Sequence, residues 1–324
     1  MPANVESMFY VGDMPWHKEG IHLIETPDTI TAIEQAGLDW KENKVSIYDE
    51  GKRVINGYYG IRREDTKNIL GVVKKGYTPL QNKEAFNFFD PLISSNYVQY
   101  ETAGSIGDGE IIWILAKLKQ CSSFKINEVD EVDKYLLLSN SHDGQSAVTI
   151  KFTPIRVVCQ NTLNIALNEG ESTRIKHMTS MRAKLEDTQM ALENIFKVYE
   201  NIEDNFKSMY EFKITNEKVK AYFDSIYPII DEKYITTESQ YIKRNTNIAI
   251  QNQLVYNFED GIGVNQYSIR GTLWAAYNAV TQYIDHPSGY KLGDNKLLKR
   301  IWYGEGEIIK KRAYKEALNI IKTA

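Results

Sequence analysis

Residues 135–152, YLLLSNSHDGQSAVTIKF, decide the fold class of this chain. Two apolar stretches, 135–139 and 147–152, flank the polar segment His142-Asp143-Gly144. Short apolar runs on either side of an Asp-Gly pair are typical of a β-hairpin, because glycine adopts the positive φ that tight turns need. The sequence therefore predicts two antiparallel strands joined at this segment.

The same pattern occurs upstream, where 97–104 and 110–118 flank Gly107-Asp108-Gly109. Two helices are expected between the strands of this half, one from Asp28 to Ala36 before Gly37, and one from Lys83 to Ile93 after Asn82 as its N-cap. Val45 to Tyr48 and Gly57 to Arg62 form a further strand pair, with Asn56-Gly57 as the turn signal near their junction. Antiparallel strands with interposed helices favour an α+β fold over a doubly wound parallel sheet.

The second half of the chain has a helical period. Apolar residues recur there at intervals of three, four or seven: Leu185, Leu192, Ile195, Tyr199, Ile202, Phe206 and Met209. This spacing indicates an amphipathic helix of several turns or a short coiled-coil seam. We expect an α+β domain over residues 1–180, mainly antiparallel sheet with interposed helices, and a helical region over residues 181–324.

The composition indicates an ordinary globular protein. The chain has 324 residues, of which 42% are hydrophobic and 25% charged. It has no apolar run long enough to cross a bilayer, and its N-terminal residues lack the pattern of a secretory signal, so no membrane association is expected. Its two cysteines make no disulfide framework. These features predict a cytoplasmic location.

The charge is unevenly distributed along the chain. The total is −4, which gives no global sign of nucleic-acid binding. Residues 291–324, however, hold nine Lys or Arg against four Asp or Glu, a net +5, so the first 290 residues carry −9. This asymmetry favours a local surface that faces a polyanion, although a solvated helix face explains it equally well.

Polar side chains are densest between residues 140 and 182. Arginine and lysine suit phosphate oxygens, and Gln, Asn and His suit unpaired base edges. The candidate nucleic-acid-binding residues are Arg156, Gln160, Asn161, Arg174, Lys176, Arg182 and His142. The structural interpretation of the same stretch is a hairpin turn at Asp143-Gly144, a helix cap at Asn161 and an ion pair at Arg156.

Motifs for metals, cofactors and nucleophilic catalysis are missing from the sequence. There is no C-x-x-C pair, no histidine pair at i, i+4, and no glycine-rich phosphate loop with its lysine. We therefore expect neither a metal nor a cofactor. One catalytic alternative stays open, in which His142, Asp143 and His177 converge in a cleft as a general acid–base group.

Six motifs along the chain resemble the phage/plasmid-like proteins of a domain-of-unknown-function family found on bacteriophages, prophages and plasmids. They are Met14-Pro-Trp-His17; Leu70-Gly-Val-Val73 with Tyr77 and Gln81-Asn82; Tyr100-Glu-Thr-Ala-Gly104; Ser141-His-Asp-Gly144; Arg156-Val-Val-Cys-Gln-Asn-Thr-Leu163; and Gly271-Thr-Leu-Trp-Ala-Ala-Tyr-Asn278. The segment Ile175-Lys-His-Met-Thr179 departs from the more His-rich form of the family. The resemblance implies a mobile-element origin and the cytoplasm of a bacterial host, and it implies no settled activity.

A fainter similarity, at the level of element order, connects the chain with single-strand annealing proteins. A hairpin followed by a helix and further antiparallel strands is similar to their core. The leading hypothesis is a non-catalytic phage or plasmid protein that binds or anneals single-stranded DNA in recombination or replication, as a homo-oligomer. Its 21 tyrosines would stack on bases, or they reflect only an AT-rich genome. The alternatives are a nucleic-acid or nucleotide enzyme, and a counter-defence protein that binds a host protein.

Overall fold

The structure is a computed structural model. It describes residues 5–12, 19–119, 123–156, 161–162, 172–191, 195–265, 267–286, 301 and 304–323. Within these ranges no helix is both long and apolar enough to cross a membrane.

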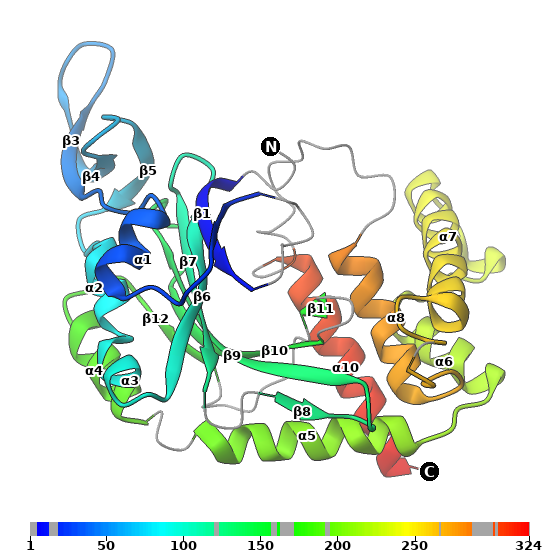
Figure 1. Cartoon of the computed structure of the whole chain (residues 1–324). Helices are drawn as coiled ribbons and strands as arrows, with labels where there is room; N and C mark the ends of the chain where they lie inside the picture. Colours follow the sequence, from blue (N-terminus) through cyan, green and yellow to red (C-terminus); the bar gives the residue numbers. More distant parts are fainter. Residues whose placement is uncertain are drawn as a thin grey trace.

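A large, mostly antiparallel sheet forms the centre of the molecule (Figure 1). Its strands follow the order β11-β10-β9-β7-β6-β1-β2, while β12 also pairs with β10 and β8 with β9. Only the β1–β2 pair among these is parallel. The strands are β1 Val5–Val11, β2 Ile21–Leu23, β6 Val98–Ile106, β7 Ile111–Leu118, β8 Ser123–Lys125, β9 Glu131–Ser141, β10 Val148–Arg156, β11 Asn161–Thr162 and β12 Ser172–Ile175.

Both predicted hairpins of this sheet are confirmed. The β6–β7 pair turns at Gly107 and Gly109, which have positive φ, and the β9–β10 pair turns at Gly144, also at positive φ. Leu138 lies opposite Ile150 on one side and Ile114 on the other, so apolar side chains form rows across the sheet. The α+β class is confirmed with them.

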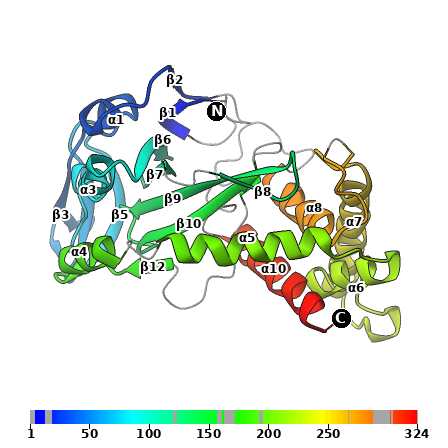
Figure 2. The same cartoon turned by 60° about the horizontal axis from the view of Figure 1, so that its bottom comes forward.

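Helices occupy the two ends of the sheet, and most of the second half of the chain is helical, as expected (Figure 2). The helices are α1 Thr29–Gln35, α2 Asn82–Asn87, α3 Asp90–Ser94, α4 Met181–Ala191, α5 Ile195–Glu211, α6 Asn216–Ile226, α7 Glu238–Asp260, α8 Leu273–Asp285 and α10 Glu305–Thr323. The expected helix at Asp28 is α1, and Asp28 is its N-cap, accepting a hydrogen bond from the Thr31 N–H at 2.8 Å. Asn82 is not the cap of α2; Gln81 takes that place and Asn82 is buried.

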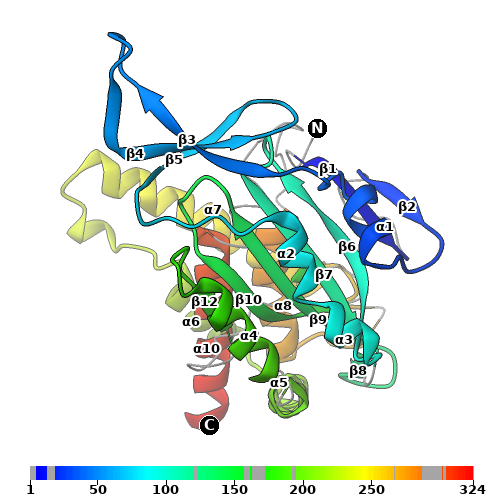
Figure 3. The same cartoon turned by 90° about the vertical axis from the view of Figure 1, so that its left-hand side faces the viewer.

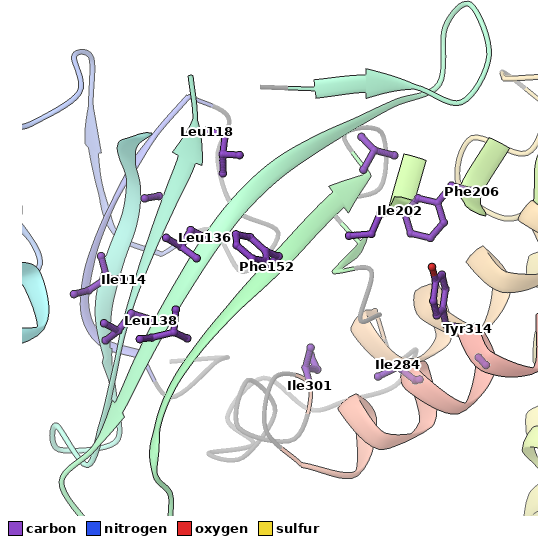
Figure 4. Packing of buried hydrophobic residues seen from close by; sticks show 14 of the residues in the cluster. Ile114, Leu118, Leu136, Leu138, Phe152, Ile202, Phe206, Ile284, Ile301 and Tyr314 are labelled. Carbon is purple, nitrogen blue, oxygen red and sulfur yellow. The ribbon is translucent and has the colours of Figure 1, made fainter. Parts of the chain in front are cut away.

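One hydrophobic core joins the sheet to both groups of helices. The cluster extends from Leu136 and Leu138 of β9 through Phe152 of β10 to Phe206 of α5 and Tyr314 of α10 (Figure 4). Phe206 also packs on Trp274 of α8, with ring centroids 4.8 Å apart. Trp274 in turn donates a hydrogen bond through its indole N–H to Asp130 at 2.8 Å, which anchors α8 to the sheet. Residues from before and after position 180 therefore share one core.

A second, three-stranded sheet projects from the body of the molecule (Figure 3). It consists of β3 Glu42–Tyr48, β4 Val54–Arg63 and β5 Ile69–Lys74, paired antiparallel. The predicted turn at Asn56-Gly57 is wrong, because both residues belong to β4. The chain turns instead over residues 49–53, where Asp49 accepts hydrogen bonds from the backbone and side chain of Arg53 and Gly51 is the central residue.

The small sheet contacts the β9–β10 turn through the backbone of β5. A Cβ atom on Gly71 would lie 2.5 Å from Asp143 Cα, closer than two such atoms can approach. Close by, the Tyr77 hydroxyl donates a hydrogen bond to the Ser141 carbonyl at 2.8 Å. Glycine is therefore needed at position 71 because backbone meets backbone there, although its φ is ordinary.

Replacing Gly71 with alanine should separate the two sheets. We expect Gly71→Ala to lower the free energy of unfolding by about 1–3 kcal/mol, the usual cost of forcing extra atoms into a packed contact. Urea unfolding followed by circular dichroism measures this change. Gly76→Ala is the matched control, since a Cβ there meets nothing within 4 Å. Equal stabilities of the two variants would contradict the close contact.

Candidate nucleic-acid interface

A buried polar cluster lies where the small sheet, α2 and the end of β9 meet. His142 is fully buried, and its Nε2 lies 3.0 Å from Asn82 Oδ1. The Asn82 amide nitrogen donates to the Leu38 carbonyl at 3.1 Å, so its oxygen faces the histidine as an acceptor. This arrangement assigns the proton of the neutral imidazole to Nε2 and leaves Nδ1 as an acceptor.

Glu42 faces that acceptor. One of its carboxyl oxygens lies 3.6 Å from His142 Nδ1, and among the described residues neither oxygen accepts a hydrogen bond. Burial raises the pKa of Glu42 to about 9. Burial also lowers the pKa of His142 to about 3, with smaller contributions from His177 and Arg63. Both groups are therefore neutral at physiological pH, and the pair is a protonated acid facing an imidazole rather than a salt bridge.

His177 and Asp143 lie beside this pair. The His177 ring stacks on Tyr77 at 4.5 Å, and its Nδ1 lies 3.2 Å from the Thr78 carbonyl. Asp143 accepts hydrogen bonds from the Gln145 N–H and the Ser141 hydroxyl. The three residues of the catalytic alternative are thus in one neighbourhood, but they are only 0%, 9% and 7% exposed for His142, Asp143 and His177. Their contacts join the two sheets.

Lysines gather on the surface beside this cluster. Lys44 of β3 donates hydrogen bonds to the carbonyls of Lys75 and Tyr77, at 2.5 and 3.0 Å, and lies over the ring of half-buried Tyr59. Burial lowers the pKa of Lys44, and repulsion from Lys75 lowers it further. Lys74 and Lys75 are exposed. The end of the small sheet therefore presents positive charge.

A backbone contact connects these lysines to the predicted binding residues. The Thr78 N–H donates to the His177 carbonyl at 3.0 Å, which brings the segment after β5 against the segment after β12. Lys176, directly before His177, is exposed. The predicted residue Lys176 thus continues the positive surface that Lys74 and Lys75 begin.

A second group of cations surrounds Glu307 at the start of α10. Its carboxylate lies 3.1 Å from Lys151, 3.0 Å from Lys311 and 3.7 Å from the predicted residue Arg174. Burial lowers the pKa of Lys151 to about 8, while Glu307 opposes that shift and Lys310 and Lys311 add to it. Arg174 keeps 63% of its side chain exposed. One carboxylate facing three cations leaves a positive local potential.

Other predicted residues fall elsewhere. Arg182 forms a two-pronged ion pair with Glu84, at 2.7 and 3.0 Å, and so joins α4 to α2. Arg156 ends β10 opposite Asn161 of β11, and their side chains are outside the described part of the structure. Gln160 is outside the described residues altogether. Within the basic C-terminal stretch, buried Lys310 pairs with Asp285 at 2.6 Å, so its charge is neutralised inside the protein.

Several residues of the site were not found from the sequence. Glu42 and Lys151 have no local motif, since their partners are distant along the chain. Lys75 could have been found from the sequence, because the doublet Lys74-Lys75 before Gly76 concentrates positive charge at the end of a strand. Among the residues that the structure describes, no three His, Cys, Asp or Glu side chains group as a metal ion would require.

Comparison with known proteins identifies the family of this chain. Residues 69–302, which are most of the chain, match the model of a domain of unknown function, DUF932. The chain belongs to this family. The matched DUF932 region starts with β5 and runs through α8, so it includes Gly71, the buried histidines, Arg174 and Lys176. Neither a search of curated proteins nor one of solved structures found a match.

Replacing Glu42 with glutamine should change how stability depends on pH. Unfolded Glu42 ionises near its ordinary value of 4.5, whereas the folded group keeps its proton up to about 9. The folded state therefore binds more protons between these values, and Glu42 makes stability fall as pH rises through this window, by about 1.4 kcal/mol per unit at most.

His142 acts in the opposite sense, since its folded pKa of about 3 costs stability as pH falls below 6.5. We expect the stability of Glu42→Gln to exceed that of wild type by a margin that widens from pH 6.5 to 8.5, in urea unfolding at each pH. The contribution of Lys151 is the same in both proteins and cancels. The exposed Glu50→Gln control should follow wild type; a constant margin for Glu42→Gln would refute the buried neutral acid.

Proposed function

We propose that this DUF932 protein is a phage or plasmid protein that binds single-stranded DNA and anneals it during recombination or replication, without catalysis, in the cytoplasm of a bacterial host. The observation that supports the proposal is the basic seam, which we define as Lys44, Lys74, Lys75, Lys176, Arg174 and Lys311. These cations come from both sheets and from α10, in a chain whose net charge is −4.

The seam suits a phosphate backbone. Lys44 and Lys75 repel each other, as do Lys151 and Lys311. A bound anion would reduce the electrostatic repulsion within each pair. A nucleic acid that neutralises them also releases its own counterions, which supplies much of the binding free energy. Tyr59 lies beside Lys44 at the same edge and offers an aromatic ring near the phosphates, the combination that single-strand binders use.

The two other hypotheses find less support. An enzyme at His142, Asp143 and His177 needs a path for substrate, and all three side chains are buried. A counter-defence protein that binds a host protein would use the acidic remainder of the surface, and charge alone does not specify such a partner.

Fluorescence anisotropy with labelled single-stranded and duplex oligonucleotides, across a salt series, tests the proposal. We expect preference for single strands and affinity that falls with salt. Lys75→Gln with Lys176→Gln should weaken binding and reduce the slope of log affinity against log salt by about 1.4, since each single-strand phosphate contact contributes about 0.7. Faster pairing of complementary strands with wild type would support annealing.

The control variant carries Lys220→Gln and Lys243→Gln, which change the net charge equally at exposed sites on α6 and α7, away from the seam. It should keep the wild-type slope. Absence of binding at low salt, or equal slopes for the two double variants, would reject the seam as a DNA site. A host protein that co-purifies in fixed ratio with such a non-binding protein would favour the counter-defence hypothesis.

A further inference from the structure

The small sheet has an exposed apolar face. Along β4 and β5 the paired residues Tyr58 and Lys74, Gly60 and Val72, and Arg62 and Ile69 share one side of the sheet. On this side Tyr58 is 46% exposed, Ile69 49% and Val72 55%. The opposite side carries Ile61 and Val73, which are buried. We call the exposed side the outer face of the small sheet.

A second exposed apolar surface lies on α7. Tyr241, Ile242 and Tyr256 are 53%, 58% and 58% exposed. Tyr256 follows the other two by about four turns of a helix with 3.6 residues per turn, so all three point to one side. Asn245, Ala249 and Asn252 are exposed between them on that side. We call this side the outer face of α7.

The two faces complement each other in charge. Residues 41–76, which form the small sheet, carry nine Lys or Arg against five Asp or Glu, a net +4. Residues 231–262, which contain α7, carry five acids against three bases, a net −2. Lys74 lies on the sheet face itself, and Glu238 and Glu259 are exposed near the two ends of α7. Among the described residues none of these three side chains makes an ion pair.

The faces are also similar in length, and they lie too far apart to meet within one chain. The β5 row from Ile69 to Lys74 is about 17 Å long, and the α7 row from Tyr241 to Tyr256 is about 22 Å long. The small sheet and α7 are at opposite ends of the molecule (Figures 1 and 2). A contact between them therefore requires two copies.

We propose that the protein assembles head to tail, with the outer face of the small sheet of one copy docked on the outer face of α7 of the next. The contact buries Val72, Ile69 and Tyr58 against Tyr241, Ile242 and Tyr256, with Lys74 near the acids of α7. In a filament the first and last copies each keep one unused face, of opposite kinds, whereas a closed ring leaves none. Such a heterologous contact produces a ring or a filament and not a symmetric dimer. The proposal does not depend on DNA binding.

Light scattering after size-exclusion chromatography tests this with two variants, Val72→Asp and Tyr256→Asp. Wild type should form species larger than a monomer as concentration rises. Each variant alone should be monomeric, because a charge buried in the contact weakens association by about tenfold or more. An equimolar mixture should give a heterodimer and nothing larger, since one copy retains its helix face and the other its sheet face.

That mixture also shows that both variants are folded, because an unfolded variant cannot restore association. A second pair, Lys74→Glu and Glu259→Lys, should weaken assembly singly and recover it when both charges are reversed. The control Ile30→Asp, at an exposed position on α1, should assemble as wild type. A monomeric wild type at all concentrations, dissociation by only one of the two aspartate variants, or a mixture that stays monomeric would each overturn the proposal.

Discussion

At Gly71 the backbone of β5 lies against the turn that follows β9, and the buried polar cluster and the lysines beside it depend on that approach. It closes the space behind it, so that Glu42, His142 and Asn82 are sealed from water. It also brings Tyr77 onto His177 and Thr78 onto the backbone of the same residue. The lysines at the end of the small sheet lie near Lys176, which follows β12, only because the two sheets are held in this way.

The seal has an electrostatic consequence on each side. Inside, a carboxyl and an imidazole face each other without water, and the low polarity of the surroundings keeps both uncharged. Outside, the folded backbone brings segments that carry lysines close together, so their charges lie near one another. Lys44 is stabilised by two carbonyl acceptors, and the cations at α10 are stabilised by the single carboxylate of Glu307. Such a surface attracts anions even though the whole chain is acidic.

The alternation of side chains along a strand allows the small sheet to take part in two contacts. Lys44 and Tyr59 belong to the side that faces the body of the molecule and the seam, while Tyr58 and Val72 belong to the opposite side. A nucleic acid on the seam and a second copy on the outer face would therefore share only Lys74, which lies on the outer face at the end of β5. In a head-to-tail assembly the seams of successive copies would repeat at a constant spacing, which multiplies weak contacts along one strand.

The sequence by itself determined the local elements. Asp-Gly pairs between apolar runs predicted the hairpins at Gly107 and Gly144, and Asp28 predicted the start of α1, because turns and caps depend on residues that are adjacent in the chain. The period of the second half likewise predicted helices. The Asn56-Gly57 prediction failed because a glycine at positive φ is also accepted inside a strand, and only the pairing of β4 with both neighbours decides between the two.

The tertiary structure alone decided the use of the charged and polar groups. The sequence shows which donors His142 and Arg182 carry, but it does not show whether they are available to a ligand. Burial makes His142 neutral, and Arg182 pairs with Glu84, which is 98 residues away in sequence. Lys151 and Glu307 meet across 156 residues. Charge state and availability depend on desolvation and on partners brought together by folding, and neither quantity is a property of a local stretch of sequence.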